Sequence, residues 1–310
     1  MKIAFRIDMG LEIGMGHYMR MSALADAFVE LGHECVFFTE KDEPVDYSGF
    51  GVIVLDTYRL SDKYIETLRV SGRILVCCDD NALYTYCCDV LLNHNFHAHE
   101  LEFRFSGERP KLLLGSKYAL LRSEFSKAEP IVVKDKAVNI FVCFGGSDVR
   151  NFTPVAIQAL CGIPDIQLTV VLGSHTKCND EVYALESPNV AVLKNPDSIS
   201  KIMQSCDIAV TAAGSMVYEL AALGIPSVLI SQADNQLKIA EFLNSSKLMK
   251  WLGSWSSTSS KELLSEVEVL LNDKERRKAE HRSLLQTVDR NGARNVAVAV
   301  LNIVKKAAQQ

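Results

Sequence analysis

The sequence lacks several features that would direct it toward particular classes of protein. None of its nine cysteines forms a CxxC pair, so we expect reduced thiols that act mostly as small core residues. The net charge is −5 and there is no basic block, which makes nucleic acid and anionic membrane surfaces poor candidate partners. The first residues, MKIAFRID, lack the long apolar stretch of a signal peptide, and this predicts a cytoplasmic location.

A continuous membrane-spanning run is also missing, although one segment comes close to it. Residues 208–230 read IAVTAAGSMVYELAALGIPSVLI, with Glu219 near the middle and Gly214, Gly224 and Pro226 as helix breakers. A charge and three breakers in this length predict a buried strand, helix and strand instead of a transmembrane helix.

What is present is a regular alternation of short aliphatic runs and amphipathic stretches. The runs KIAFRI, CVFFT, GVIVLD, RILVCC, DVLLN and KLLLG are typical of strands buried on both faces. The polar residues 126–137 break the rhythm, and it restarts with NIFVCF, QLTVVLG, NVAVL, DIAVTA and PSVLI. We therefore predict an α/β protein of two Rossmann-like domains, residues 1–130 and 131–310, the second ending in a helical tail.

The unusual polar and glycine residues lie where each predicted strand ends. Ligands of open α/β sheets bind beyond the carboxyl ends of the strands, so these positions predict a ligand in a cleft between the two domains. The candidate positions are Gly14, Gly16, His17, Tyr58, Asp80 and Asn95 in the first half, and Gly145, Gly146, Ser147, Gly214, Ser215, Glu219, Asn235 and Gln236 in the second.

In the second half, two glycine loops point to an anion site. Gly145-Gly146 and Gly214-Ser215 each follow a strand and precede a helix, so backbone N–H groups and helix N-termini can hold a diphosphate without metal. Glu219 is a carboxylate on an otherwise apolar helix face, and a carboxylate suits the vicinal hydroxyls of a ribose. Taken alone, each glycine loop has an ordinary alternative as a tight turn, and Glu219 has one as a solvent-facing glutamate.

In the first half, His17 lies in a glycine loop at the start of a helix. Histidine has an ordinary pKa of about 6.5, and a helix N-terminus disfavours its charged form, so the sequence predicts a neutral base. The ordinary alternative for a histidine near a helix start is a structural one.

The motifs together resemble a known family. Arg6, Asp8 and the string I-G-x-G-H-x-x-R, which ends at Arg20, are followed in order by LDTYRLS, CDDN, CDVLLNHN, SKYALLRSEF, FGGSD, AAGSMVYEL and DNQ. This order is similar to that of the UDP-2,4-diacetamido-2,4,6-trideoxy-β-L-altropyranose hydrolases of pseudaminic acid biosynthesis. The wider group resembles the GT-B glycosyltransferases of the MurG type. Met9 to Glu12 and Asn81 depart from the pattern on the sugar side.

The resemblance implies a GT-B fold, UDP bound by the second domain, His17 as general base and Tyr58 placing the water. It also implies no cofactor and a small-molecule UDP-sugar as the partner, and an even acidic surface fits a monomer. The substrate-binding positions that it adds are Arg6, Asp8 and Arg20, beside Gly14, Gly16, Asp80, Asn95, Gly145, Gly146, Ser147, Gly214, Ser215, Glu219, Asn235 and Gln236.

Three functions remain open at this point. An inverting hydrolase needs only one base, because a nucleoside diphosphate leaves without a general acid. A glycosyltransferase would use His17 on an acceptor hydroxyl, and a non-catalytic UDP-sugar-binding protein would not need His17.

Two other patterns are given ordinary structural roles. His94, His97 and His99 do not match a zinc spacing, so we predict solvent-facing loop histidines and no metal. Adjacent Asp79 and Asp80 are expected to point to opposite faces.

Overall fold

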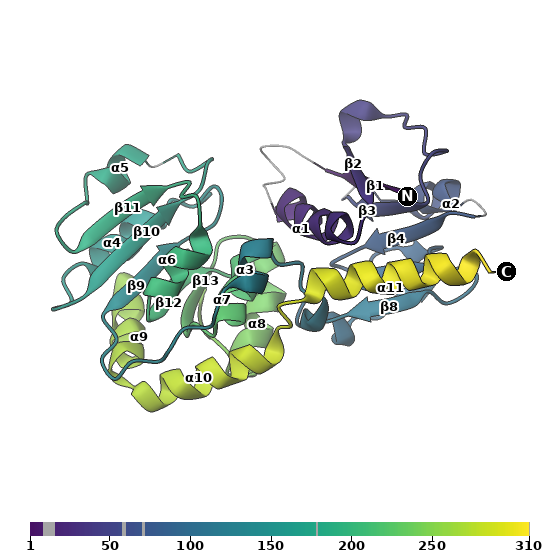
Figure 1. Ribbon diagram of the computed structural model, residues 1–310. Helices are drawn as coiled ribbons and strands as arrows, with labels where there is room; N and C mark the ends of the chain where they lie inside the picture. The colour runs from purple at the N-terminus through teal and green to yellow at the C-terminus, as the bar shows by residue number, and fades with distance from the viewer. Residues whose placement is uncertain (9–15, 58–59, 70–71, 178, 310) are drawn as a thin grey trace. The chain divides into compact units, whose positions relative to one another are not determined.

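The computed structural model describes residues 1–8, 16–57, 60–69, 72–177 and 179–309 (Figure 1). The chain divides into two compact units. The first comprises Met1–Ser123 and Asp289–Gln310, and the second comprises Glu124–Val288. Each unit contains one six-stranded, all-parallel sheet, which confirms the predicted α/β class.

The sheet of the first unit has the strand order β2-β1-β3-β4-β6-β8. All six strands coincide with predicted apolar runs. In chain order they are β1 (Lys2–Ile7), β2 (Glu34–Phe38), β3 (Val52–Asp56), β4 (Ile74–Cys78), β6 (Val90–Asn93) and β8 (Lys111–Leu114). A separate two-stranded ribbon pairs β5 (Thr85–Tyr86) with β7 (Arg104–Phe105).

Successive residues of these strands enter two different cores, which is why the runs are apolar throughout. Ile3 and Phe5 belong to a core that also contains residues of α1 (Gly16–Glu30). Ala4, on the opposite face, belongs to a second core with Ile65 of α2 (Asp62–Leu68). The sheet is therefore covered on both sides within its own unit.

Helix α1 ends as its sequence predicts. Gly32 has a φ of 83°, and the His33 N–H bonds the Phe28 carbonyl 3.1 Å away. This is the Schellman arrangement, in which a glycine takes the left-handed position just beyond the helix.

The last helix, α11 (Gly292–Ala307), belongs to the first unit and not to the second, where the predicted boundary had placed it. Figure 1 shows α11 beside the sheet of the first unit. Val296, Ala297 and Val300 are fully buried in the core that also contains residues of α1. A Cβ on Gly292 would lie 2.2 Å from the carbonyl oxygen of Ala119, so only glycine allows this approach. The helical periodicity of the sequence predicted this helix, but it did not indicate which sheet the helix packs against. The short helix α3 (Ser123–Lys127) lies at the change from one unit to the other.

The sheet of the second unit has the strand order β11-β10-β9-β12-β13-β14, the order of the Rossmann fold. Its strands are β9 (Asn139–Cys143), β10 (Gln167–Leu172), β11 (Val190–Lys194), β12 (Ile208–Ala212), β13 (Ser227–Ser231) and β14 (Lys250–Ser254). The first five were predicted. The sixth, KWLGS, was not, because this half-buried edge strand contains Lys250 and Gly253 and is not a continuous apolar run.

After α3, seven more α-helices of the second unit lie among the described residues. They are α4 (Thr153–Leu160), α5 (Asn179–Tyr183), α6 (Ile199–Ser205), α7 (Met216–Leu223), α8 (Leu237–Ser245), α9 (Ser260–Asn272) and α10 (Lys274–Thr287). Residues 208–230 form β12, α7 and β13, as the sequence predicted. Among the described residues, no helix combines the length and apolar content that crossing a membrane would require.

Candidate active site

In the first unit, the strand order reverses between β1 and β3, and His17 and Asp56 lie at this point. Ile7 of β1 is paired with Asp56, the last residue of β3, and His17 follows in the first turn of α1. His17 Nδ1 is 2.8 Å from Asp56 Oδ1. Both side chains are buried, at 6% and 1% exposure. A sheet of this type binds its ligand at such a reversal, so the pair occupies the position expected of catalytic groups.

The Asp56 carboxylate determines which nitrogen of His17 carries the proton. Its pKa is held far below its usual value: burial opposes ionisation, but the charge of Arg20 and hydrogen bonds from Arg20 and His17 outweigh it. An ionised carboxylate only accepts hydrogen bonds, so Nδ1 must donate. The neutral imidazole then has its lone pair on Nε2, which is the form that a general base requires.

Arg20 extends this pair into a network. It lies one turn after His17 on α1 and donates to both oxygens of Asp56, from Nε at 2.7 Å and from Nη2. Its Nη1 donates to Asp80 Oδ2 at 2.8 Å, and Asn95 Nδ2 donates to Asp80 Oδ1 at 2.9 Å. Three predicted substrate-binding residues are therefore brought together around Asp56.

Histidines 94 and 97 correct the prediction of solvent-facing loop histidines. His94 and His97 are 5% and 6% exposed, and only His99 of the three is exposed. Burial, followed by the charge of Arg20, lowers the pKa of His94 to about 4, so it is neutral at neutral pH. The loop after β6 folds inward toward Arg20, which its polar composition did not indicate. Asp79, as predicted, has partners separate from those of Asp80: it accepts the backbone N–H groups of Asn81 and Ala82.

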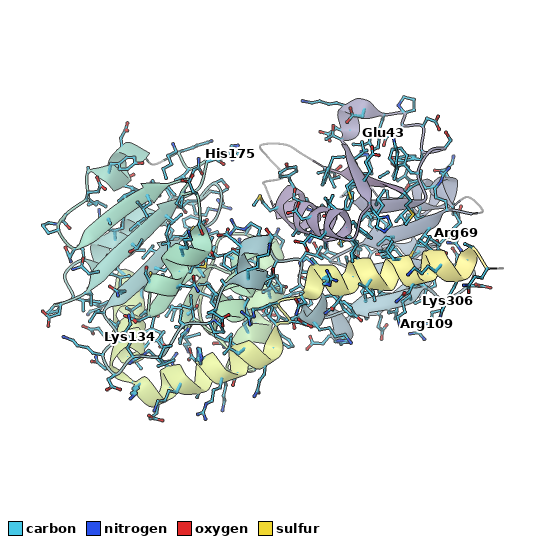
Figure 2. All side chains as sticks on the ribbon, viewed as in Figure 1. Glu43, Arg69, Arg109, Lys134, His175 and Lys306 are labelled. Carbon is cyan, nitrogen blue, oxygen red and sulfur yellow. The ribbon has the colours of Figure 1, made fainter. Side chains whose placement is uncertain are left out.

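Arg6 and Asp8 form a second buried group at the end of β1. Arg6 Nη1 donates to Asp8 Oδ1 at 3.1 Å, and its Nε donates to Glu43 Oε1 at 2.8 Å. Glu43, labelled in Figure 2, follows β2 and the short 3-10 turn η1 (Glu40–Asp42) and also accepts from Tyr64. These contacts fix the strand end that precedes residues 9–15. Two of the predicted site residues, Gly14 and Tyr58, lie outside the described residues.

In the second unit, the strand order reverses between β9 and β12, and the two glycine loops follow these strands. Gly145 has a φ of 87°, which favours glycine, and residues 145–147 are partly or fully exposed. Asp148 turns inward and accepts the N–H groups of Phe152 and Thr153 at 3.0 and 2.9 Å. The N-terminus of α4 is thus capped by the chain itself, contrary to our expectation that it faces the ligand.

Gly173, after β10, fixes the position of the Gly145-Gly146 loop. A Cβ at Gly173 would lie 2.4 Å from the Cα of Gly146, and the His175 N–H bonds the Gly146 carbonyl at 3.0 Å. His175, labelled in Figure 2, lies on the loop after β10 and is exposed. No sequence pattern indicated this role, because one glycine after a strand is ordinary.

The second glycine loop leads directly into α7. Ser215 is the N-cap residue and is exposed, and its side chain makes no capping hydrogen bond. Unlike α4, this helix leaves its first N–H groups uncapped by a side chain, which suits an anion. Glu219 lies one turn further on and is 9% exposed.

Gln236 joins this loop from the 3-10 turn η4 (Asp234–Gln236). Its Oε1 accepts the Gln232 N–H at 2.9 Å, so its Nε2 is the atom left to donate. That nitrogen is 3.8 Å from where a Cβ on Gly214 would stand. Gln232 in turn donates to Asp148 Oδ1 at 2.7 Å. The predicted residues Gly146, Gly214 and Gln236 are therefore linked through Asp148 and Gln232, whereas Asn235 is exposed beside them.

The sequence did not single out Asp56, Asp148, Gln232 or Gly173. Asp56 had one available signal, since it ends a buried strand as the first residue of the D-x-Y motif. Asp148 had another, as the residue after Gly-Gly-Ser. Neither signal shows whether the side chain would contact a ligand or hold a neighbouring residue in place.

The chain is similar to two proteins from other organisms and to a solved structure. The chain is 28% identical to the uncharacterised protein MJ1062 of Methanocaldococcus jannaschii over 76% of its length, and it spans 57% of that protein. It is 24% identical to the UDP-2,4-diacetamido-2,4,6-trideoxy-beta-L-altropyranose hydrolase of Campylobacter jejuni, over 78% of this chain and 96% of that protein. The crystal structure of Acinetobacter baumannii MurG matches with a TM-score of 0.66 at 14% identity, covering 97% of this chain and all of MurG.

The likeness to MurG gives the fold, which is the predicted GT-B fold. Residues 139–296, about half of the chain, match the glycosyltransferase family 28 C-terminal domain. This range covers both glycine loops, Glu219 and Gln236. The chain therefore belongs to the family of the glycosyltransferase family 28 C-terminal domain.

Proposed function

We propose that the protein is an inverting, metal-independent hydrolase that cleaves a UDP-linked 2,4-diacetamido-2,4,6-trideoxyhexose to UDP and the free sugar. The observation that carries the proposal is the 2.8 Å contact between His17 Nδ1 and Asp56 Oδ1. A protein that only binds a nucleotide-sugar has no need of a buried imidazole with a fixed tautomer. A base that acts on water or a hydroxyl group does need it.

In the proposed reaction, Asp56 keeps the proton on Nδ1 while Nε2 removes a proton from water. The water oxygen forms a bond to the anomeric carbon on the face opposite UDP. The bond from that carbon to the phosphate oxygen breaks, and its electron pair leaves with UDP. The proton on Nε2 then passes to solvent. Attack from the opposite face inverts the configuration, and we assign Tyr58 the task of placing the water.

The second unit supplies the groups suited to the departing nucleotide. The uncapped N-terminus of α7 and the Gln236 amide offer N–H donors for the diphosphate. Glu219 is assigned to the ribose hydroxyls, since a carboxylate accepts both hydrogen bonds of a vicinal diol. UDP is stable as an anion once its charge is held in this way. A single base is then sufficient, whereas most glycosidases need two carboxylates.

The identity of the sugar rests on similarity to the Campylobacter protein, whose length this chain nearly covers. We assign the recognition of the sugar to the motifs of the first half that resemble those of the hydrolases. These motifs include Asp8, His17 and Asp80. On this proposal the enzyme takes part in pseudaminic acid biosynthesis.

A UDP-release assay tests the function. The protein is incubated with candidate UDP-sugars and no acceptor, with and without EDTA, and UDP is measured together with the anomeric configuration of the sugar by NMR. Release without acceptor, unaffected by EDTA and with inversion, is the expected result. Retention of configuration, or loss of activity with EDTA, would contradict the mechanism.

The family match and the MurG fold favour one second candidate, a glycosyltransferase with a UDP-sugar donor. His17 would then take the proton of an acceptor hydroxyl instead of water. UDP release only when an acceptor is added would identify this activity. Tight UDP-sugar binding with no release under either condition would leave the binding-protein alternative.

A further inference from the structure

Arg20 lies between the carboxylates of Asp56 and Asp80 and pairs with both of them. Its Nε and Nη2 bind the two oxygens of Asp56, and its Nη1 binds Asp80. Its side chain is 13% exposed. This two-pronged contact is the strongest geometry available between arginine and a carboxylate, and it fixes the orientation of Asp56.

Asp56 Oδ1 is shared between Arg20 and His17. The oxygen that lies 2.8 Å from His17 Nδ1 also accepts from Arg20 Nη2, which is itself 3.3 Å from that ring nitrogen. The guanidinium is therefore close enough to reduce the charge that the imidazole experiences. A carboxylate alone at this distance would favour a second proton on the ring.

The charged groups around His17 can be followed element by element. Arg20 comes from α1, Asp56 from β3 and Asp80 from the end of β4, where burial keeps the Cys78 thiol neutral by raising its pKa. His94, after β6, is neutral at neutral pH. Asp8, after β1, is paired with Arg6. With His17 neutral, one arginine thus faces two ionised carboxylates, Asp56 and Asp80.

We propose that Arg20 is a positioning residue that controls the protonation of His17. It holds Asp56 in the orientation that accepts the Nδ1 proton, and it cancels part of the carboxylate charge that would favour a second proton on the ring. Asp80, which accepts a hydrogen bond from Asn95, weakens this effect because it also pairs with Arg20 and offsets part of the positive charge of the arginine. The use of Nε2 in catalysis rests on the proposed function, whereas the protonation of His17 does not.

The test is an NMR titration of the free protein labelled with ¹⁵N and ¹³C in its histidines, with the His17 signal assigned by the His17→Asn variant. Arg20→Gln leaves two uncompensated carboxylates, so the midpoint of the His17 titration should rise by about one pH unit or more. Asp80→Asn removes a carboxylate and concentrates Arg20 on Asp56, so the midpoint should fall. Arg20→Lys keeps the charge without the fork and should lie between Arg20→Gln and the natural protein.

Opposite shifts from two neighbouring substitutions distinguish charge control from a general disturbance of structure. Arg69→Gln is the matched control: Arg69, labelled in Figure 2, pairs with Asp89 in the same unit, and its loss should leave the midpoint unchanged. Midpoints that stay in place, or that move in the same direction in Arg20→Gln and Asp80→Asn, would overturn the proposal. If Arg20→Gln does not fold, Asp80→Asn decides alone: a fall supports the proposal, and no change or a rise refutes it.

The activity assay separates this inference from the proposed function. Where UDP is released, the acidic limb of the pH–rate profile should move in each variant by the same amount and in the same direction as the His17 midpoint. Opposite midpoint shifts in a protein that releases no UDP would uphold the role of Arg20 and reject the hydrolase.

Discussion

The two sheets have nearly the same construction but opposite kinds of chemistry at their carboxyl ends. Both are six-stranded and parallel, and in both the strand order reverses beside the first strand of the unit. At this reversal the first unit has a partly buried network of ions, centred on Asp56, Arg20 and Asp80. The second has glycines, a helix N-terminus and an amide there, and the buried Asp148 beside them caps α4.

This difference indicates what each unit can do. Ionised groups in a buried network set the protonation of a neighbour, so the first unit is suited to moving a proton. Neutral N–H donors hold an anion without competing for protons, so the second is suited to holding a diphosphate. If the comparison is right, substitutions in the first unit should change turnover and those in the second should change nucleotide affinity.

The largest effect is expected from His17→Asn. Loss of the general base should lower the rate of UDP release by about 10²–10⁴-fold, while the affinity for UDP, measured by calorimetry, stays unchanged. His99→Asn, at the exposed histidine of the loop after β6, is the control and should retain full activity. A His17 variant that binds UDP weakly but turns over at the normal rate would reverse the roles of the two units.

Glu219→Ala should have the opposite signature. Losing a carboxylate that accepts from ribose hydroxyls costs about 1.5–3 kcal/mol, so the affinity for UDP should fall by roughly 10–150-fold. The rate at saturating substrate should change far less. Glu268→Ala, on the exposed face of α9, controls for the loss of one negative charge. Equal affinities of the two variants for UDP would remove Glu219 from the site.

Gln236→Glu sharpens the comparison further, because it retains the oxygen that accepts the Gln232 N–H and replaces only the donor. A carboxylate oxygen facing a diphosphate should weaken UDP binding by about tenfold or more, since about tenfold is the lower end of the range for one hydrogen bond to a charged group. Binding of uridine, which has no phosphate, should not change. Equal losses for UDP and uridine would place Gln236 away from the phosphates.

The smallest effect on binding is expected from Gly173→Ala. The new Cβ would meet the Gly146 backbone at 2.4 Å, so the loop must move, and a forced shift of this kind costs about 1–3 kcal/mol of stability. The melting temperature should fall, with a severalfold loss of UDP affinity. Gly162→Ala, which has nothing within 4 Å of its Cβ, should change neither. A normal melting temperature for Gly173→Ala would mean that the loop after β10 is not tightly packed against the Gly145-Gly146 loop.

Much of the fold could be predicted because buried parallel strands have a simple signature. Eleven of the twelve strands of the two sheets were visible as apolar runs, and Gly32 marked the end of α1. Strand β14 escaped because this half-buried strand contains Lys250 and Gly253 and is not a continuous apolar run. The position of α11 escaped because an apolar helix face does not specify which sheet it covers.

For the site, the sequence indicated the loops but not their internal contacts. His17, Glu219 and Gln236 stood out by residue type and by their place after a strand. The partners that orient them, Asp56 and Gln232, are ordinary residues whose role depends on distances across the sheet. The burial of His94 is likewise a property of how a loop folds back, and a polar loop composition does not reveal it.

The return of α11 to the first unit has a consequence for how the protein is made. The chain leaves this unit near Ser123, builds all of the second unit, and comes back near Asp289. Until Val296, Ala297 and Val300 have emerged from the ribosome, the sheet of the first unit has part of one apolar face uncovered. The second unit can be completed during synthesis, so we expect it to fold first and the unit with the acid–base network to follow.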